Sequence, residues 1–241
     1  MVQSYVVKRM ELVVKSVFKR NEVKFMLTQE QYLHIKGVIK KYMQEDEFGS
    51  YLVQSLYFDT DNWQAIRASI EKPKFKEKLR LRCYGIPTAD DIMYLELKKK
   101  LRGIVYKRRI SFPMALLAHK TPREIALEDD SQIGRELSFY LNTYPVQEKA
   151  HVVYNREPFE NDQGLRITFD SNLRFCTTKL DYHNPHGGLP ILDPHLIIME
   201  VKTQEGIPLW LASELSELKI YPSSFSKYGT GYKKYILQKV N

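Results

Sequence analysis

The chain has 241 residues, of which 37 are lysine or arginine and 29 are aspartate or glutamate, so its formal net charge is +8. With 43% hydrophobic residues it can bury one large core, or at most two, which excludes a disordered chain. The charge predicts an anionic partner: nucleic acid, a phosphorylated small molecule, polyphosphate or a membrane surface. Two cysteines cannot form a disulfide framework, and no stretch approaches the roughly 20 apolar residues of a membrane span. We therefore expect a soluble, cytoplasmic protein.

Segments rich in β-branched and aromatic residues, or alternating polar with apolar, predict strands. They are residues 20–27, 51–58, 75–84, 92–100, 104–112, 150–157, 164–175 and 195–203. Helical patterns lie at residues 28–43, 61–71, 113–119, 131–142, 208–218 and 227–238. Mostly hairpin-length connections favour an antiparallel sheet with helices packed on it. No shift in composition marks a boundary, so we expect a single domain over residues 1–241, with residues 1–19 as an N-terminal extension.

Positive charge gathers on one face of the predicted strands. In "KFKEKLRLRCYG" (74–85), Lys76, Lys78, Arg80 and Arg82 alternate with mostly apolar residues. The corresponding faces of the other strands carry further cations, namely Lys24, Lys98, Lys100, Lys107, Arg109, Arg156, Arg166, Arg174 and Lys202. The anions on these faces are Glu22, Glu96, Asp170 and Glu200. Cations therefore far outnumber anions on one side of the predicted sheet.

A solvent-exposed sheet face is the simplest explanation of any one such strand. An exposed face normally mixes signs, however, because like charges opposite each other on neighbouring strands repel. The amphipathic helices also need an apolar sheet face to cover. If they cover it from outside, the cationic face must line the inside of a curled sheet. We therefore predict an α+β fold, a closed eight-stranded antiparallel β-barrel forming a tunnel, with helices packed outside.

A tunnel lined by lysine and arginine must hold anions, because desolvating unpaired ions costs several kcal/mol each. An elongated polyanion neutralises a whole row of cations at once. Glu22, Glu96 and Glu200 are hard oxygen ligands that suit Mg²⁺ or Mn²⁺ bridging phosphate oxygens. The residues alone thus predict a tunnel for a phosphate chain with a divalent metal.

Seven ordered motifs carry a family resemblance: "RNEVKF", "KLRLRCYG", "YLELKKK", "YNREPF", "RITFDSNLRF", "MEVKTQ" and "SFSKYGTGY". In this order they resemble the VTC domain, the polyphosphate polymerase branch of the triphosphate tunnel metalloenzymes, which are relatives of the CYTH phosphatases. The resemblance implies metal-dependent cleavage of ATP, transfer of its γ-phosphoryl group to a growing polyphosphate chain, and a C-terminal helix that closes one tunnel end. The SPX domain and membrane-spanning tail of eukaryotic relatives are missing from this sequence. We expect a stand-alone synthetase, or a subunit that associates with a membrane-protein partner.

The resemblance also implies roles for individual residues. We expect Arg80, Arg82, Lys98 and Arg156 to clamp the triphosphate, and Glu200 to hold the metal. Glu96 and Glu22 are further metal candidates that could instead orient the cations. The expected contacts of the remaining phosphate chain are Lys24, Lys78, Lys107, Arg109, Arg166, Arg174, Lys202 and Lys227.

Three alternatives remain open. The same site could hydrolyse a triphosphate or polyphosphate with water as the acceptor. The chain could bind polyphosphate without turning it over. Nucleic-acid binding is the least favoured, since it would need aromatic side chains interleaved with the basic ones, and tyrosine and phenylalanine fall mostly on the opposite face.

Overall fold

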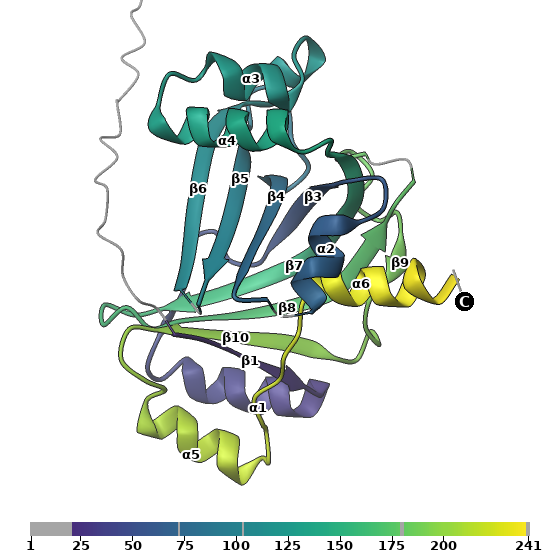
Figure 1. Cartoon of the computed structure of the whole chain (residues 1–241). Helices are drawn as coiled ribbons and strands as arrows, with labels where there is room; N and C mark the ends of the chain where they lie inside the picture. Colours follow the sequence, from purple (N-terminus) through teal and green to yellow (C-terminus); the bar gives the residue numbers. More distant parts are fainter. Residues whose placement is uncertain (1–20, 72, 103, 179–180, 240–241) are drawn as a thin grey trace, which may run out of the picture.

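The computed structural model describes residues 21–71, 73–102, 104–178 and 181–239 (Figure 1). The expected extension, residues 1–19, lies outside them. The strands are β1 Asn21–Leu27, β2 Gln44–Glu45, β3 Tyr51–Asp59, β4 Phe75–Tyr84, β5 Ile92–Leu101, β6 Ile104–Pro113, β7 Gln147–Glu160, β8 Arg166–Cys176, β9 Leu189–Pro190 and β10 Ile197–Thr203. The helices are α1 Gln29–Ile39, α2 Gln64–Ile70, α3 Pro122–Glu128, α4 Gln132–Thr143, α5 Leu209–Glu217 and α6 Lys227–Tyr235, with 3₁₀ turns η1 Met114–Ala118 and η2 Leu237–Lys239.

Local sequence explains where the helices begin. Thr28 caps α1: its hydroxyl accepts from the backbone N–H of Gln31, whose side chain accepts from the backbone N–H of Thr28. Thr121 and Glu124 make the same reciprocal pair at α3, a short helix that the sequence analysis did not predict. None of the described helices has the length and apolar character needed to span a bilayer.

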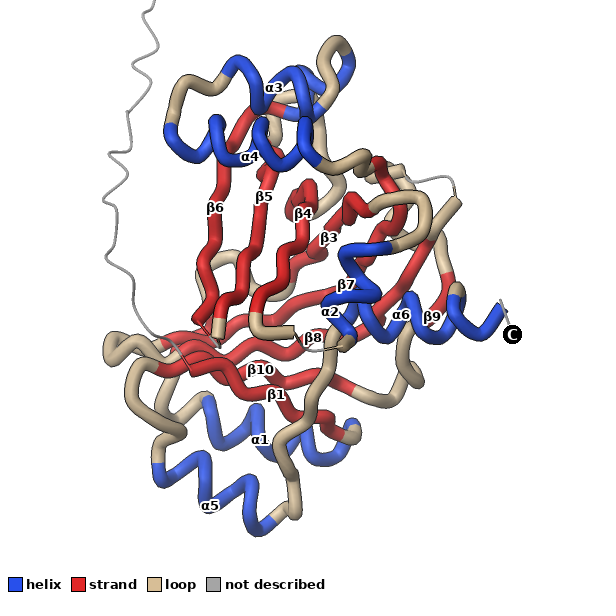
Figure 2. The backbone as a smooth tube through the Cα atoms, in the orientation of Figure 1, coloured by secondary structure: helices blue, strands red, loops and turns tan. Residues whose placement is uncertain are grey.

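The long strands form one antiparallel sheet in the order β1-β10-β8-β7-β3-β4-β5-β6. Figure 2 shows that this sheet curls into a half-barrel with two walls. We call the strands β3–β6 the β4 wall, and the strands β7, β8, β10 and β1 the β10 wall. The α+β class and the antiparallel curled sheet are confirmed.

The predicted closure of the barrel is wrong. In the described part of the chain, β1 and β6 end the sheet and do not pair with each other. The segment before α6 occupies the free edge of β1: Pro222 bridges Phe25, and the N–H of Ser223 donates to the carbonyl of Lys24 at 2.7 Å. The backbone groups that would close the barrel on this side are therefore partly used by another segment.

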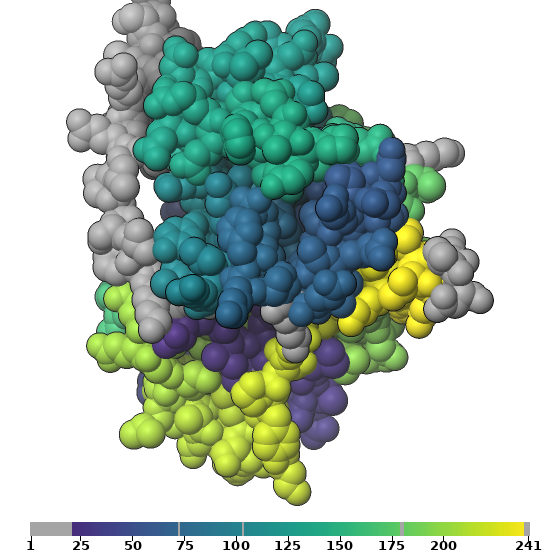
Figure 3. Space-filling view, in the orientation of Figure 1, coloured from purple at the N-terminus to yellow at the C-terminus, as the bar shows by residue number. Residues whose placement is uncertain are grey.

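Two helical layers cover the outer face of the sheet, as expected. Helices α1 and α5 pack on apolar residues of β1, β8 and β10, including Phe25, Ile167 and Val201. Helices α3 and α4 pack on β4–β6, against residues such as Leu81 and Leu97. Figure 3 shows the two layers at opposite ends of the molecule. The outer face is thus the apolar one, and the cationic side chains lie on the inner face.

Helices α2 and α6 pack together at one end of the half-barrel (Figure 1). They join a third cluster that includes Tyr57, Tyr154 and Phe175 from the sheet, with Ile66 of α2 and Tyr228 of α6. In register, Tyr57 lies opposite Arg80, so this cluster lies on the same face as the cations. The C-terminal helix therefore closes one end of the inner face, as the family resemblance implied.

Candidate functional site

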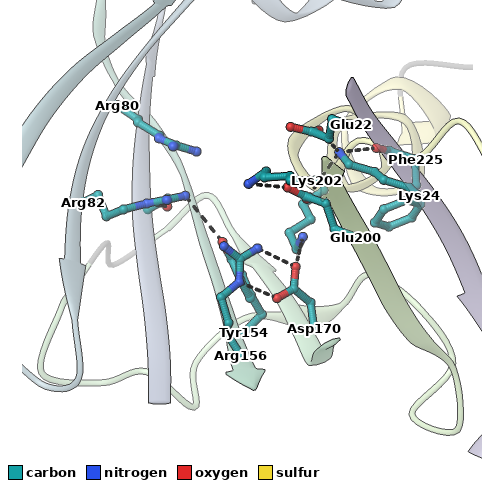
Figure 4. A network of polar contacts seen from close by, with 12 residues as sticks. Glu22, Lys24, Arg80, Arg82, Tyr154, Arg156, Asp170, Glu200, Lys202 and Phe225 are labelled. Carbon is teal, nitrogen blue, oxygen red and sulfur yellow. Dashed lines mark hydrogen bonds and ion pairs between the residues drawn. The ribbon is translucent and has the colours of Figure 1, made fainter. Parts of the chain in front are cut away.

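The inner face gathers basic side chains from both walls into what we call the basic trough. Its cations are Lys24, Lys78, Arg80, Arg82, Lys98, Lys107, Arg109, Arg156, Lys202 and Lys227. Figure 4 shows Arg80 and Arg82 pointing from the β4 wall toward Arg156, Lys202 and Glu200 on the β10 wall. Strand alternation explains the grouping, because every second residue of each strand faces inward.

Glu96 anchors the cations of the β4 wall. Its carboxylate is 1% exposed and lies 2.7 Å from Nη2 of Arg80, 2.6 Å from Nζ of Lys107 and 3.8 Å from Nη1 of Arg109. Burial acts to raise the pKa of Glu96, but Arg80, Arg82 and Lys107 outweigh it and hold this pKa at about 2. Glu96 therefore orients three cations and has little capacity left to bind a metal.

Arg82 is buried without a carboxylate partner among the described residues. Its Nε donates to the Ser55 hydroxyl at 3.1 Å and its Nη2 to the Tyr154 hydroxyl at 3.4 Å. Its exposed fraction is 7%. Neutral hydroxyls orient this guanidinium without cancelling its charge, so Arg82 remains available to an anion in the trough.

On the β10 wall, Asp170 is shared by two cations. Arg156 binds it through two parallel hydrogen bonds of 2.7 and 2.8 Å, and Lys227 of α6 donates to it at 2.5 Å. Asp170 is fully buried. Burial acts to raise the pKa of Asp170, but Lys227 and Arg156 outweigh it and lower this pKa. Two positive groups over one carboxylate leave a net positive charge here.

The outer end of the β10 wall carries a second acidic group. Glu200 lies 2.6 Å from Nζ of Lys202 and 3.9 Å from Nζ of Lys24, and Glu22 lies 3.3 Å from the same Lys24 nitrogen. Burial acts to raise the pKa of Glu200, but Lys202 and Lys24 outweigh it, so the pKa is lowered and the group is ionised at neutral pH. The two carboxylates therefore flank one ammonium group.

Lys98 and Lys78 lie beside each other on adjacent strands of the β4 wall. No hydrogen bond or ion pair joins Lys98 to the residues that the structure describes. Burial lowers the pKa of Lys98, and Arg80 and Lys24 lower it further, while Glu22 across the trough acts to raise it. Burial also lowers the pKa of Lys78, to about 8. Charges on the two walls are thus close enough to influence each other.

Two predicted contact residues lie away from the centre of the trough, one at its rim and one on the opposite face of the sheet. Arg166 lies at the rim, 3.5 Å from Asp46 and 3.7 Å from Glu160. Arg174 is opposite Val153 in register and faces away from the trough; its guanidinium donates to the carbonyls of Gly187 and Gly188. We therefore leave Arg174 out of the site.

Asp170 was predicted on the polar face but without a role, and Tyr57 and Tyr154 were not predicted as site residues. Tyr57 and Tyr154 lie on the inner face because they alternate with residues that pack outside. The hydroxyl of Tyr57 accepts from Arg80 at 3.3 Å. Their position in alternating strands, "VQSLYFD" and "VVYNRE", is the signal that could have identified them.

Because of Glu96, the free energy of unfolding of the protein should depend on pH in the acidic range. Because its pKa is lowered from 4.5 to about 2, its stabilising effect is complete above about pH 4.5 and is lost as the pH falls toward 2. As the pH falls through this range, the free energy of unfolding of Glu96→Gln should therefore decrease by about 3 kcal/mol less than that of the wild type. Urea unfolding of both proteins at pH 7 and at successive steps down to pH 2.5 would measure it. Parallel pH profiles for the two proteins would contradict the assignment.

Comparisons with known proteins place this geometry in a family. A family model described as "VTC domain" matches residues 19–236. The structure resembles a protein from Hippeastrum that is described as a proposed adenylyl cyclase with a dominant triphosphatase activity. The TM-score is 0.54 and the sequence identity 17%, and the match covers 88% of this chain and 95% of that one. It also resembles a protein from Bacillus halodurans proposed to be an adenylate cyclase, with a TM-score of 0.54, 14% identity, and coverage of 89% and 96%. No curated protein matched the sequence. At these identities the two structures show a shared fold.

Proposed function

Because the chain belongs to the VTC domain family, we propose that its basic trough binds a triphosphate and catalyses metal-dependent phosphoryl transfer, adding the γ-phosphoryl group of ATP to inorganic polyphosphate. One observation carries the proposal: Arg80 and Arg82 of the β4 wall face Arg156 of the β10 wall, which shares Asp170 with Lys227 of α6, and cations exceed the carboxylates that balance them. A chain of phosphates is an anion with the length and charge to bridge the two walls.

Phosphoryl transfer depends mainly on positioning and on neutralising charge that develops on phosphate oxygens. We assign Arg80, Arg82, Lys98 and Arg156 to the triphosphate, because they converge from both walls. Glu96 and Asp170 hold two of these arginines in place before substrate binds. Such fixed cations need little reorganisation during the reaction. Lys24, Lys78, Lys107, Arg109, Lys202 and Lys227 would contact the rest of the chain, and Arg166 would contact it at the rim.

The proposal includes a divalent metal, Mn²⁺ or Mg²⁺, and the residues present fit one. Glu200 and Glu22 lie on adjacent strands on either side of Lys24, and both have lowered pKa values, so both offer ionised oxygens. Mg²⁺ sites commonly use one or two carboxylates together with substrate phosphates. A metal bound here would neutralise charge on phosphate oxygens. Glu96 fits less well, because its side chain is 1% exposed and pairs with three cations, whereas that of Glu200 is 8% exposed and pairs with two.

Hydrolysis is the second candidate, and a specific observation favours it. In the described residues β1 and β6 do not pair, and the side chains of Lys107 and Lys202 are 45% and 30% exposed, so water reaches this part of the trough. The Hippeastrum protein that shares the fold is also described as having a triphosphatase activity. A third possibility is binding of polyphosphate without turnover, by a subunit that acts beside a membrane-protein partner.

One experiment separates these functions. The purified protein is incubated with ATP labelled at the γ-phosphorus and Mn²⁺, and the products are sized on a gel. A polymerase makes labelled chains longer than three phosphates. A hydrolase releases labelled orthophosphate and no long chain. Unchanged ATP, together with tight polyphosphate binding that survives Glu200→Ala, would indicate a binder and contradict the proposed catalysis.

A further inference from the structure

Asp59, at the end of β3, joins the two helices that close the trough. Its side chain is 0% exposed and accepts four hydrogen bonds. Three come from the backbone N–H groups of Thr60, Ala65 and Ile66 at 2.8, 2.8 and 2.9 Å, so the carboxylate caps the beginning of α2. The fourth comes from the hydroxyl of Tyr228 in α6, at 2.9 Å. Asp59 therefore fixes α6 relative to α2 and β3.

Tyr228 connects this carboxylate to the β4 wall. Its ring stacks on Tyr57, with centroids 4.3 Å apart and planes 14° from parallel. The Tyr57 hydroxyl in turn accepts from Arg80. A continuous path of contacts therefore runs from Asp59 through two stacked rings to an arginine that we assign to the triphosphate.

The residue before Tyr228 contacts the β10 wall. Lys227 donates to Asp170, which also holds Arg156, and its ammonium lies 4.4 Å from the centre of the Tyr154 ring. Two consecutive residues at the start of α6 are thus linked to an arginine of each wall, Lys227 through Asp170 to Arg156 and Tyr228 through Tyr57 to Arg80. Because they belong to one helical turn, a shift of α6 would move both contacts together.

Close packing fixes the height of α6 over the sheet. A Cβ atom on Gly231 would lie 2.3 Å from the Phe175 ring of β8, so only glycine permits this approach. Ser226 caps the helix, accepting from the N–H of Gly229 at 3.2 Å. Phe175 therefore limits how closely α6 approaches the sheet, and the hydrogen bond from Tyr228 to Asp59 fixes α6 relative to α2.

We propose that Asp59 and Tyr228 are positioning residues that set the distance between the two halves of the phosphate clamp, Arg80 on the β4 wall and Arg156 on the β10 wall together with Lys227 of α6. The functional consequence rests on the proposed triphosphate binding, whereas the positioning itself does not. Neither residue touches the phosphate chain. Their role is exerted through Tyr57 and Lys227.

The first test needs no substrate. Burial acts to raise the pKa of Tyr57, but Arg80, Arg82 and Lys78 outweigh it and hold the pKa at about 8. Ultraviolet titration should therefore detect a tyrosine ionisation near pH 8 that is lost in Tyr57→Phe, and this loss distinguishes it from Tyr154, whose pKa is also lowered. In Tyr228→Phe and Asp59→Asn, displacement of Arg80 should raise this pKa by about one unit. The matched control is Tyr232→Phe, the same change one turn further along α6, where the ring packs on Trp63. An unchanged titration in both Tyr228→Phe and Asp59→Asn would overturn the proposal.

The second test measures binding of inorganic tripolyphosphate by calorimetry. We expect the dissociation constant to rise about tenfold in Tyr228→Phe and to change less than about twofold in Tyr232→Phe. If Asp59→Asn fails to fold, Tyr228→Phe alone decides, because it keeps the stacked ring. Equal losses in Tyr228→Phe and Tyr232→Phe would overturn the positioning role. A wild-type protein that binds no tripolyphosphate, yet shows the expected shift in Tyr57 titration, would contradict the proposed function and leave the positioning supported.

Discussion

Replacing Arg82 with methionine is expected to lower turnover by about 10²- to 10³-fold without lowering the stability of the fold. Arg82 is buried, and its hydrogen bonds in the described structure go to neutral hydroxyls with no carboxylate within ion-pair distance, so its charge can act on an anion in the trough. Its removal leaves no carboxylate without a partner, so the free energy of unfolding should stay constant or rise. Steady-state kinetics and urea unfolding on the same preparation would measure both quantities.

Arg174→Met is the matched control for this prediction. Arg174 is an arginine of β8 in the same sheet, but its guanidinium donates to two backbone carbonyls on the opposite face. This change should reduce stability modestly, by about 1 kcal/mol, and leave turnover of the folded protein within about twofold. If Arg82→Met and Arg174→Met lowered turnover equally, the trough would not be the site of chemistry.

Glu200→Gln should separate binding from turnover. Glu200 is a negative group among Lys202, Lys24 and Arg156, so removing its charge makes the trough more positive. Tripolyphosphate should then bind at least as tightly without metal, whereas metal-dependent turnover should fall by at least about 10²-fold. Calorimetry without metal, and kinetics across a Mn²⁺ titration, would show the two effects.

Glu96→Gln provides the comparison for Glu200. It removes the same charge from a buried carboxylate, but one that is surrounded by Arg80, Lys107 and Arg109. Its turnover should depend on Mn²⁺ concentration as the wild type does, even if the maximum is lower. A Glu200→Gln protein that kept wild-type turnover at every Mn²⁺ concentration would contradict the metal assignment.

The inward and outward faces of the strands could be predicted from the sequence because side chains alternate with period two. Lys24, Arg80, Lys98 and Lys202 lie inside, and the apolar residues between them lie under helices, as expected. The rule holds as long as a strand is regular. It therefore located most of the cations without any knowledge of how the strands assemble.

Arg174 shows where the alternation rule stops. In β8 the pairing with β7 shifts register between Val153 and Asn155, and Asn172 has a φ of 52°. One additional residue in a strand reverses the direction of every side chain beyond it. Arg166 and Asp170 precede this irregularity and face inward, whereas Arg174 follows it and faces outward. The sequence "DSNLRF" carries no strong signal of the bulge beyond an asparagine, which tolerates positive φ.

Barrel closure could not be predicted because it depends on contacts between distant segments. Whether β1 and β6 pair depends on the curvature of the whole sheet, and the edge of β1 is occupied by Pro222 and Ser223, far along the chain. The same reason explains why Asp59 was missed. Its partner Tyr228 lies 169 residues away, and only the folded chain brings the two together.

The central claim is that cations from both walls converge on one phosphate chain. A crystal structure of the protein with tripolyphosphate and Mn²⁺, with the metal located by anomalous scattering, tests it most directly. We expect phosphorus atoms between Arg80 and Arg82 on one side and Arg156 on the other, with the manganese ion beside Glu200. Tripolyphosphate bound only at the rim or on the outer face, with the space between the two walls holding no phosphate, would contradict it.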